Sequence, residues 1–285
     1  MYRAALLFVS PFLLLASACQ TGQQTSSEGL PTLAAIAEQQ ADRASKLKLL
    51  ESGGTIELRT KTEEGERFED CALELWRDGP KLALRLRKLG ERFLWVGTDG
   101  AQWWLFELAS DPVRVTIAPN GLDAPVSFGE SNWILEPRQL LQLAGLEPLE
   151  MIAPLPGEQE VVLEASGLLR FDVAGGENPD WTRTRWYVDR KTFLPQRIEA
   201  LNSQGLVMLE FRLSGYEPIA ARDTPLGGWP DFPRKVRVQG HLGETDLRIF
   251  FNRPSARGTR VKPALFDLDR LMQTFRPVEV KYLER

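Results

Sequence analysis

The chain holds few side chains that could act as a nucleophile, a proton shuttle or a metal ligand. Its 285 residues include one histidine, His241, and two cysteines, Cys19 and Cys71. These are too few for the Cys and His sets that hold structural zinc, and the sequence contains neither a P-loop nor a dinucleotide-binding glycine motif. His241 stands in a Gly-His-Leu-Gly stretch, which indicates an exposed turn residue. We therefore expect no catalytic residue, no metal site and no cofactor.

Neighbouring carboxylates offer the remaining route to catalysis. Glu63 and Glu64 form one such pair, and Glu69 and Asp70 form another, both in polar stretches. Two carboxylates can share the work of glycoside hydrolysis, so a hydrolase of envelope polymers stays open as an alternative. Solvated surface charge explains the same residues more simply, and we expect the protein not to be an enzyme.

The first residues have the three-part layout of an export signal. Residues 1–18 contain a positively charged start, the apolar run AALLFVSPFLLL and small residues. The apolar run is shorter than the roughly 20 residues that span a bilayer. The stretch LASAC resembles the bacterial lipobox, with Ala16 where Leu is usual, and the lipobox cysteine becomes the lipidated N-terminus. We expect a lipoprotein signal peptide over residues 1–18 and a lipid anchor on Cys19; plain secretion with cleavage after Ala18 is the alternative.

A lipid on Cys19 would place the protein in the cell envelope. Stable anchoring takes more than one acyl chain, which a lipoprotein cysteine supplies. Gln20, where an Asp would retain enterobacterial lipoproteins at the inner membrane, favours the outer membrane facing the periplasm by resemblance to that sorting rule. We expect a flexible tether over residues 19–30 and a single domain over residues 31–285.

The domain has the composition of a globular protein and the patterning of a β-sheet. Hydrophobic residues make up 43% and charged residues 26%, and the net charge of −4 argues against a nucleic-acid partner. The pattern predicts a helix over residues 31–50 ended by the glycines at 53–54, a mid-chain helix over 137–144 and a helical turn near 268–275. About a dozen strands with period-2 alternation, mostly joined in sequence, predict an antiparallel meander.

Apolar side chains at alternate strand positions could line one face of this sheet. They are Leu73, Leu75, Leu82, Leu84, Leu86, Phe93 and Trp95 in the first half, and Leu209, Phe211, Leu213, Leu247 and Ile249 in the second. An ordinary closed core is one interpretation. The other is an apolar cavity for acyl chains, because a sheet curved around helices can leave such a space.

Three local patterns concern the burial of single side chains and strands. Cys71 alternates with the leucines that follow it, which predicts a small buried hydrophobe; a reactive thiol is the alternative. The runs at residues 92–96 and 102–108 are apolar on both faces, so we expect those strands to be covered on both sides.

The order of these elements resembles the Lol lipoprotein carriers and their relatives, a superfamily that includes LolA, LolB and the sensor RseB. The stretch at 188–219 carries a strand ending in Asp, a Lys-Thr turn, Leu-Pro and a polar Gly turn between strands, as members often do. PRKVRV at 233–238 and LFDL at 265–268 match the family's ending. The resemblance covers most of residues 31–270. It implies a half-open antiparallel β-barrel, with the N-terminal and mid-chain helices packed on its concave face.

The same resemblance implies a function. It is that of a membrane-tethered periplasmic lipoprotein that binds acyl chains of lipids or lipoproteins in an apolar cavity, in lipoprotein sorting or outer-membrane biogenesis. An envelope sensor or interaction module like RseB, with an unidentified protein partner, and a structural lipoprotein are the alternatives. The family's functional arginine has no assigned counterpart here, and residues 120–122 and 226–229 are the candidate receptor-type loops.

Overall fold

The computed structural model describes residues 29–62, 65–120, 141–142, 144–147, 161–174, 182–240 and 245–283. The signal peptide, the lipidation site Cys19, most of the tether, Glu63, Glu64, His241 and most of the expected mid-chain helix lie outside these residues. Within the described part, no helix is long and apolar enough to cross a membrane.

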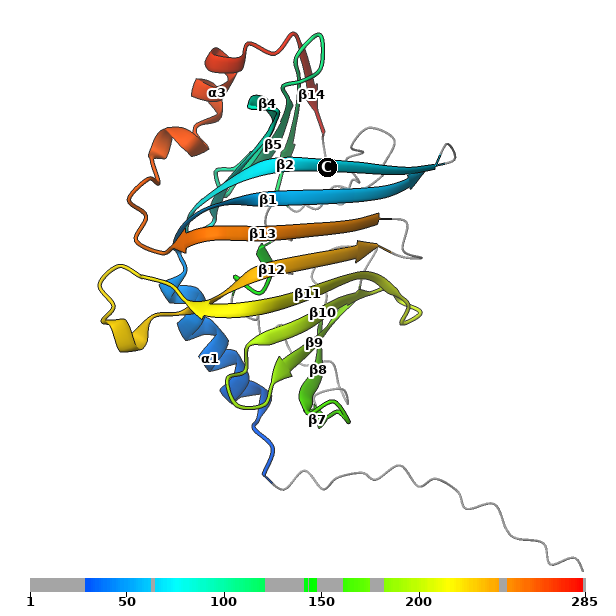
Figure 1. The fold of residues 1–285 in the computed structure, drawn as a ribbon, viewed down its shortest axis with the longest axis vertical. Coiled ribbons are helices and arrows are strands. Elements are labelled where there is room, and N and C mark those ends of the chain that lie inside the picture. The colour runs from blue at the N-terminus through cyan, green and yellow to red at the C-terminus, as the bar shows by residue number, and fades with distance from the viewer. Residues whose placement is uncertain are drawn as a thin grey trace, which may run out of the picture.

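One open sheet dominates the described residues (Figure 1). Its fourteen strands are β1 (Leu49–Thr62), β2 (Gly65–Asp78), β3 (Lys81–Lys88), β4 (Glu91–Thr98), β5 (Gln102–Glu107), β6 (Arg114–Pro119), β7 (Val162–Leu163), β8 (Leu168–Ala174), β9 (Arg183–Asp189), β10 (Pro195–Leu201), β11 (Val207–Pro218), β12 (Asp231–Gly240), β13 (Thr245–Ser255) and β14 (Glu279–Tyr282). The helices whose full bounds lie within the described residues are α1 (Leu33–Lys46) and α3 (Leu268–Phe275), together with the 3₁₀ turns η1 (Leu226–Gly228) and η3 (Pro263–Phe266).

The sheet order is β14-β6-β5-β4-β3-β2-β1-β13-β12-β11-β10-β9-β8-β7. Neighbours pair antiparallel except β14, which runs parallel to β6. The end strands β7 and β14 do not pair with each other, so the sheet is a half-open barrel, as predicted. The strand β14 was not expected, because four residues are too few for alternation to stand out.

The helix α1 (Leu33–Lys46) lies within the predicted range of residues 31–50, but it begins later and ends sooner than predicted. The Thr32 side chain caps it by accepting a hydrogen bond from the backbone N–H of Ala35 at 3.2 Å. The expectation that the glycines at 53–54 end this helix is wrong, because they lie inside β1. A Cβ added at Gly54 would collide with the backbone carbonyl of Phe250 on β13. Glycine therefore permits the close approach of two strands at this point.

The helix α1 defines the two faces of the sheet, and we call the face on which it packs the inner face. In Figure 1 α1 passes behind the strands of the second half, so the outer face is turned to the viewer. The buried inner-face cluster joins Leu33, Ile36 and Leu47 of the α1 region to residues of most strands from β2 to β12. Leu141, within the expected mid-chain helix, is buried in the same cluster.

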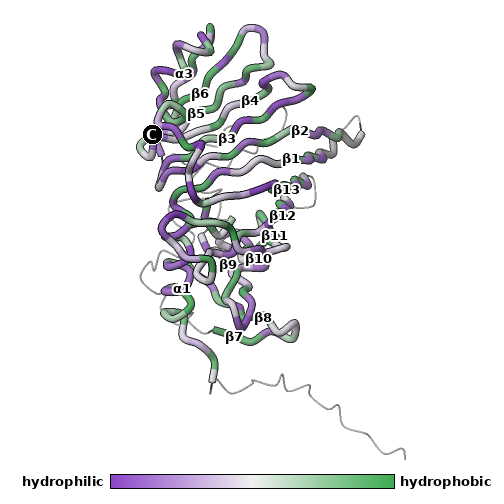
Figure 2. Tube along the Cα trace, turned by 60° about the vertical axis from the view of Figure 1, so that its left-hand side comes forward, coloured by the Kyte–Doolittle hydropathy of each residue, from purple (hydrophilic) through white to green (hydrophobic). Residues whose placement is uncertain are grey.

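Within the described part of the chain, η3 and α3 pack on the outer face of the first half of the sheet, where their side chains join a buried cluster that extends from Trp76 of β2 to Ile117 of β6. The rings of Phe106 and Phe275 lie 5.2 Å apart between centroids, and Trp76 stacks on Trp95 at 6.0 Å. On the inner side of the same strands, Leu94, Val96, Trp103, Leu105 and Ala118 form a separate buried cluster. The prediction that these strands are covered on both sides is confirmed, and Figure 2 shows hydrophobic stretches along β4, β5 and β6.

Candidate apolar binding face

Five half-buried aliphatic side chains meet on the inner face of the central strands. Cross-strand register places Ile56 of β1 opposite Ile249 of β13, and places Leu84 and Leu86 of β3 opposite leucines of β2. Leu247 lies two residues before Ile249 on the same strand, so its side chain points to the same face. All five pack against the buried inner-face cluster while staying partly exposed. We call Ile56, Leu84, Leu86, Leu247 and Ile249 the inner strip.

Exposure rises along these strands away from α1. On β3, Leu82 is 1% exposed, whereas Leu84 and Leu86 are only half-buried. The same change occurs on β1, where Leu50 is fully buried and Ile56 is not. The inner face is therefore a closed core at one end and a partly uncovered apolar surface at the other.

The structure brings most of the predicted apolar residues together. Those found in or against the inner-face cluster are Leu73, Leu75, Leu82, Leu84, Leu86, Leu209, Phe211, Leu213, Leu247 and Ile249. Phe93 packs on the adjacent cluster around Leu94 and Val96. A bulge in the pairing of β3 with β4, between Leu86 and Arg87, leaves Phe93 without a residue directly opposite it on β3.

Trp95 does not share this face, which corrects the prediction that grouped it with the β3 leucines. Its register partner on β3 is Arg85, an outer-face residue, and its ring lies 5.7 Å from that of Phe275 on α3. Because β4 is apolar at consecutive positions, its sequence cannot say which side chains point inward. Trp95 therefore belongs to the outer cluster under α3.

Two buried arginines join the inner face to the mid-chain segment at 144–147. Arg77 of β2 is 3% exposed; it donates to the carbonyls of Gly79 and Leu146, each at 2.9 Å, and forms an ion pair of 2.5 Å with Glu147. Burial lowers the pKa of Arg77, and the nearby Glu147 carboxylate opposes that shift. This segment is therefore held by charge-assisted hydrogen bonds.

Arg43 of α1 makes a second link. Its guanidinium donates to the carbonyls of Gly145 and, at 3.3 Å, Asp231, and also to the Gln40 side chain. Burial lowers its pKa, whereas the charges of Tyr216 and Asp231 act in the opposite direction. Sequence reasoning missed both arginines, although Arg77 continues the alternation of Leu73 and Leu75 and so could have been expected to point inward.

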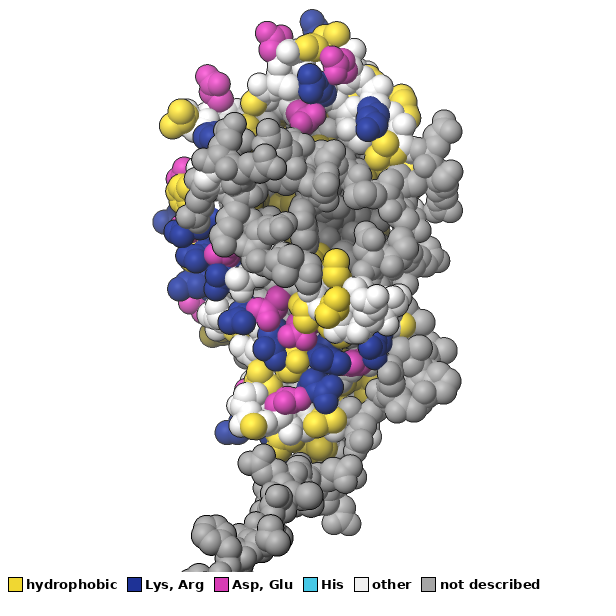
Figure 3. Space-filling model, turned by 90° about the vertical axis from the view of Figure 1, so that its right-hand side faces the viewer, with side chains coloured by type: hydrophobic (Ala, Val, Ile, Leu, Met, Phe, Trp, Pro, Cys, Tyr) yellow, Lys and Arg dark blue, Asp and Glu magenta, His cyan; other side chains and the backbone are white. Residues whose placement is uncertain are grey.

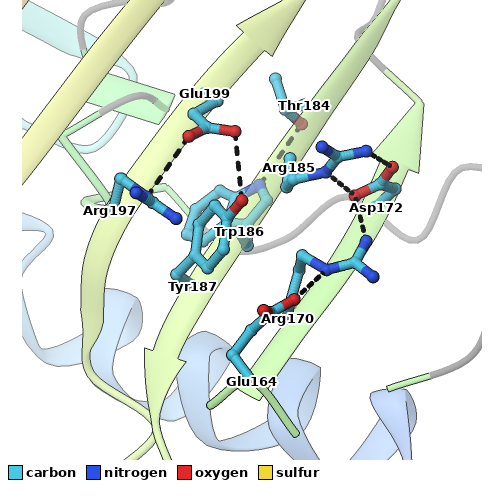
Figure 4. Close-up of polar contacts among 9 residues, drawn as sticks. All are labelled: Glu164, Arg170, Asp172, Thr184, Arg185, Trp186, Tyr187, Arg197 and Glu199. Carbon is cyan, nitrogen blue, oxygen red and sulfur yellow. Dashed lines mark hydrogen bonds and ion pairs between the residues drawn. The ribbon is translucent and has the colours of Figure 1, made fainter. Parts of the chain in front are cut away.

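The outer face of β8 and β9 carries ion pairs instead (Figure 4). Arg185 donates two hydrogen bonds to Asp172, at 2.8 and 2.9 Å. Arg170 lies 2.5 Å from Glu164 and 4.0 Å from Asp172. In Figure 3, Lys and Arg side chains gather along the left margin, which is the side of the outer face. This face is a solvated charged surface, in contrast to the inner strip.

A buried carboxylate lies beside these pairs. Glu199 of β10 accepts a hydrogen bond from the Tyr187 hydroxyl at 3.3 Å, and one of its oxygens lies 3.3 Å from Arg197 Nε. Burial raises the pKa of Glu199, whereas Arg197 acts in the opposite direction. The Arg197 guanidinium also lies 3.6 Å from the centre of the Tyr187 ring. Each carboxylate drawn in Figure 4 thus has a guanidinium partner.

The other sequence candidates are placed as follows. Glu69 and Asp70 are consecutive on β2, so their side chains point to opposite faces, and Glu69 lies 3.6 Å from Lys88. Cys71 is buried opposite Ile56, and burial raises the pKa of its thiol. Among the described residues no group of three His, Cys, Asp or Glu side chains could hold a metal.

Of the two candidate loops, the one at 226–229 is described in full. It contains η1, Leu226 is 72% exposed, and the Trp229 indole donates to the carbonyl of Thr224 at 3.2 Å. In the other loop, only Asn120 lies within the described residues.

Comparison with known proteins identifies the fold. No protein-family model and no curated protein matches the sequence. A DUF1329 family protein from Desulfovibrio piger shares the fold with a TM-score of 0.56 at 14% identity, over 84% of this chain and 99% of that one. A domain named as a putative outer membrane lipoprotein-sorting protein, from Vibrio parahaemolyticus, matches with a TM-score of 0.54 at 12% identity, over 83% of this chain and 97% of that one. The LolA superfamily protein NE2245 from Nitrosomonas europaea matches with a TM-score of 0.51 at 12% identity, over 84% of this chain and 99% of that one. The fold is therefore LolA/LolB-like, as the resemblance predicted.

Proposed function

We propose that this chain is an exported, lipid-anchored envelope protein whose inner strip binds acyl chains of lipids or lipoproteins, without catalysing a reaction. The observation that carries the proposal is the inner strip itself. Aliphatic side chains of three strands stay partly exposed on the inner face of a sheet that does not close. Apolar side chains that a folded domain leaves partly exposed on one face are a candidate binding surface for an apolar partner.

The dimensions and chemistry of the strip suit a hydrocarbon chain. From β3 to β13 the sheet spans three strand spacings, or roughly 14 Å. A guest lying across it would meet aliphatic side chains of the strip on β3, β1 and β13, with Leu73 and Cys71 of β2 between them. Each methylene that it buries contributes about 0.8 kcal/mol. Ligands in such sites are held by apolar contact with few polar groups, which matches a role as a passive carrier or receptor.

The N-terminal pattern and the fold support the cellular setting. The lipobox-like stretch before Cys19 would tether the protein to a membrane, and the outer membrane facing the periplasm is our proposed location. A domain named for lipoprotein sorting shares this fold. We place the protein's role in lipoprotein sorting or outer-membrane biogenesis.

The test compares two substitutions on one strand. Ile249→Asn places an amide in the inner strip, whereas Phe250→Asn alters an equally half-buried apolar residue on the outer face. Lipids retained by each purified variant are extracted and quantified by mass spectrometry. We expect roughly tenfold less acyl lipid on Ile249→Asn, because a polar group buried without a partner costs about 1–3 kcal/mol, and no change on Phe250→Asn. Equal retention by both variants would refute the inner strip as the binding surface.

The anchor is tested separately with Cys19→Ser. The wild-type chain should fractionate with membranes and yield a lipid-modified N-terminal peptide, and the variant should do neither. A variant that stays with membranes would show that another feature tethers the chain.

A further inference from the structure

The strand β14 leaves one edge of the sheet unpaired. Among the described residues, only β6 pairs with it, and β14 ends the sheet order. Val278, Val280 and Tyr282, beside and within this strand, are 75%, 39% and 66% exposed. An exposed edge with apolar side chains is a ready template for another strand.

The apolar row on β14 continues the outer cluster. Val280 lies opposite Val115 of β6, and Tyr282 lies opposite Ile117. Both β6 residues are buried in the outer cluster under α3. In-register residues share a face, so the apolar layer runs beyond its cover onto the free edge.

The backbone groups of Val280 point away from the sheet. The N–H of Leu283 donates to the carbonyl of Ile117 at 2.9 Å, and the N–H groups of Val278 and Glu279 both face the carbonyl of Val113, at 2.9 and 3.4 Å. Alternate residues of a strand turn their N–H and C=O groups to opposite edges, so Val280 turns both outward.

We propose that this edge pairs with the β14 of a second copy of the chain, antiparallel and centred on Val280. The stretch VEVKY at 278–282 is complementary to itself in that register. Val280 lies opposite its own copy, Val278 lies opposite Tyr282, and Glu279 lies opposite Lys281. Opposite charges across antiparallel strands are favourable, and the residue at the two-fold axis has the outward backbone groups that a hydrogen-bonded pair requires.

Such a dimer joins two sheets through a symmetric, isologous contact. The strand is short, so the pair belongs to the small, transient class of interfaces. The dimer does not depend on acyl-chain binding, because the inner strip lies on β1, β3 and β13 and the edge lies beyond β6.

Two charge reversals test the proposed register. Lys281→Glu and Glu279→Lys each place like charges opposite each other twice in a homodimer, which weakens self-association by about tenfold or more. Glu279→Lys also removes the 2.9 Å ion pair of Glu279 with Arg114 of β6, so recovery of association in a mixture is the result that identifies the register. An equal mixture of the two variants restores both Glu–Lys pairs. Sedimentation velocity of the purified chain, in one detergent throughout, measures association.

We expect the wild type to self-associate, each variant to be monomeric, and the mixture to form heterodimers. A monomeric wild type, variants that associate as it does, or a mixture that stays monomeric would overturn the proposal.

Cross-linking checks the two-fold centre. A cysteine at position 280 should form an oxidised dimer, whereas one at position 281, opposite Glu279, should not. Equal dimer yield at both positions would contradict a register centred on Val280.

Discussion

Replacing Arg77 with methionine should loosen the attachment of the mid-chain segment to the sheet. Methionine keeps an apolar stem of similar length but donates no hydrogen bond. The change leaves the Leu146 carbonyl and the Glu147 carboxylate without the partner that now lies 2.9 and 2.5 Å away. Arg77 itself is 3% exposed, so little water can replace its guanidinium.

The expected cost follows from this burial. Removing one member of a buried ion pair costs about 3–5 kcal/mol. The Glu147 side chain is 22% exposed and can recover part of its hydration, so we expect about 3 kcal/mol. With a urea dependence of roughly 3 kcal/mol/M for a domain of this size, the unfolding midpoint should fall by about 1 M.

Urea unfolding followed by circular dichroism measures this shift, with Glu147→Gln and the double variant completing a thermodynamic cycle. Because Arg77 and Glu147 contact each other, their effects should be non-additive by about 1 kcal/mol or more. A midpoint for Arg77→Met within about 0.2 M of the wild type, or strict additivity, would refute the idea that this contact holds the segment.

Three further predictions concern packing and titration. Gly54→Ala should destabilise the fold by about 1–3 kcal/mol because its methyl group would meet the backbone of β13, whereas Gly227→Ala, with nothing within 4 Å, should leave the thermal midpoint unchanged. The hydrogen bond from Arg237 lowers the pKa of Asp246, so the ionised Asp246 stabilises the folded state at pH values above the ordinary Asp pKa, and this contribution is lost as the pH falls through the lowered pKa. Asp246→Asn should therefore reduce the free energy of unfolding at pH 7 and change it little in strong acid. Cys71, whose thiol pKa is raised by burial, should react slowly with iodoacetamide in the native protein and rapidly in urea, and fast native labelling would contradict its burial.

The sequence predicted the fold where its patterns were unambiguous. Strict alternation in β3 and β13 identified the inner-facing side chains of those strands correctly. Where consecutive residues were apolar, as around Trp95, alternation could not predict which side chains point to the inner face. The packing of α3 on Trp95 shows that this side chain points to the outer face. The glycines at 53–54 misled, because a glycine can end a helix or allow two strands to approach, and the second role depends on Phe250, far along the chain.

The candidate site was predictable in part. Four residues of the inner strip, Leu84, Leu86, Leu247 and Ile249, were predicted from alternation, whereas Ile56 was not. Alternation also did not show which inward side chains stay partly exposed. The buried arginines were not predicted, because they donate hydrogen bonds to backbone carbonyls of distant segments; Arg77, for example, donates to the carbonyl of Leu146. The exposed side chains of Val280 and Tyr282 were not predicted, because β14 is short and pairs with β6, a strand far from it in the sequence.

Photo-cross-linking along β3 tests acyl-chain binding most directly. A photoreactive residue is placed in turn at positions 84, 85, 86 and 87 of the membrane-tethered protein, and cross-linked lipid is identified by mass spectrometry. Leu84 and Leu86 point into the inner strip, whereas Arg85 and Arg87 point outward. Acyl-chain adducts should therefore form at 84 and 86 and be absent at 85 and 87. Adducts that ignore this alternation, or that form only at 85 and 87, would contradict binding on the inner face.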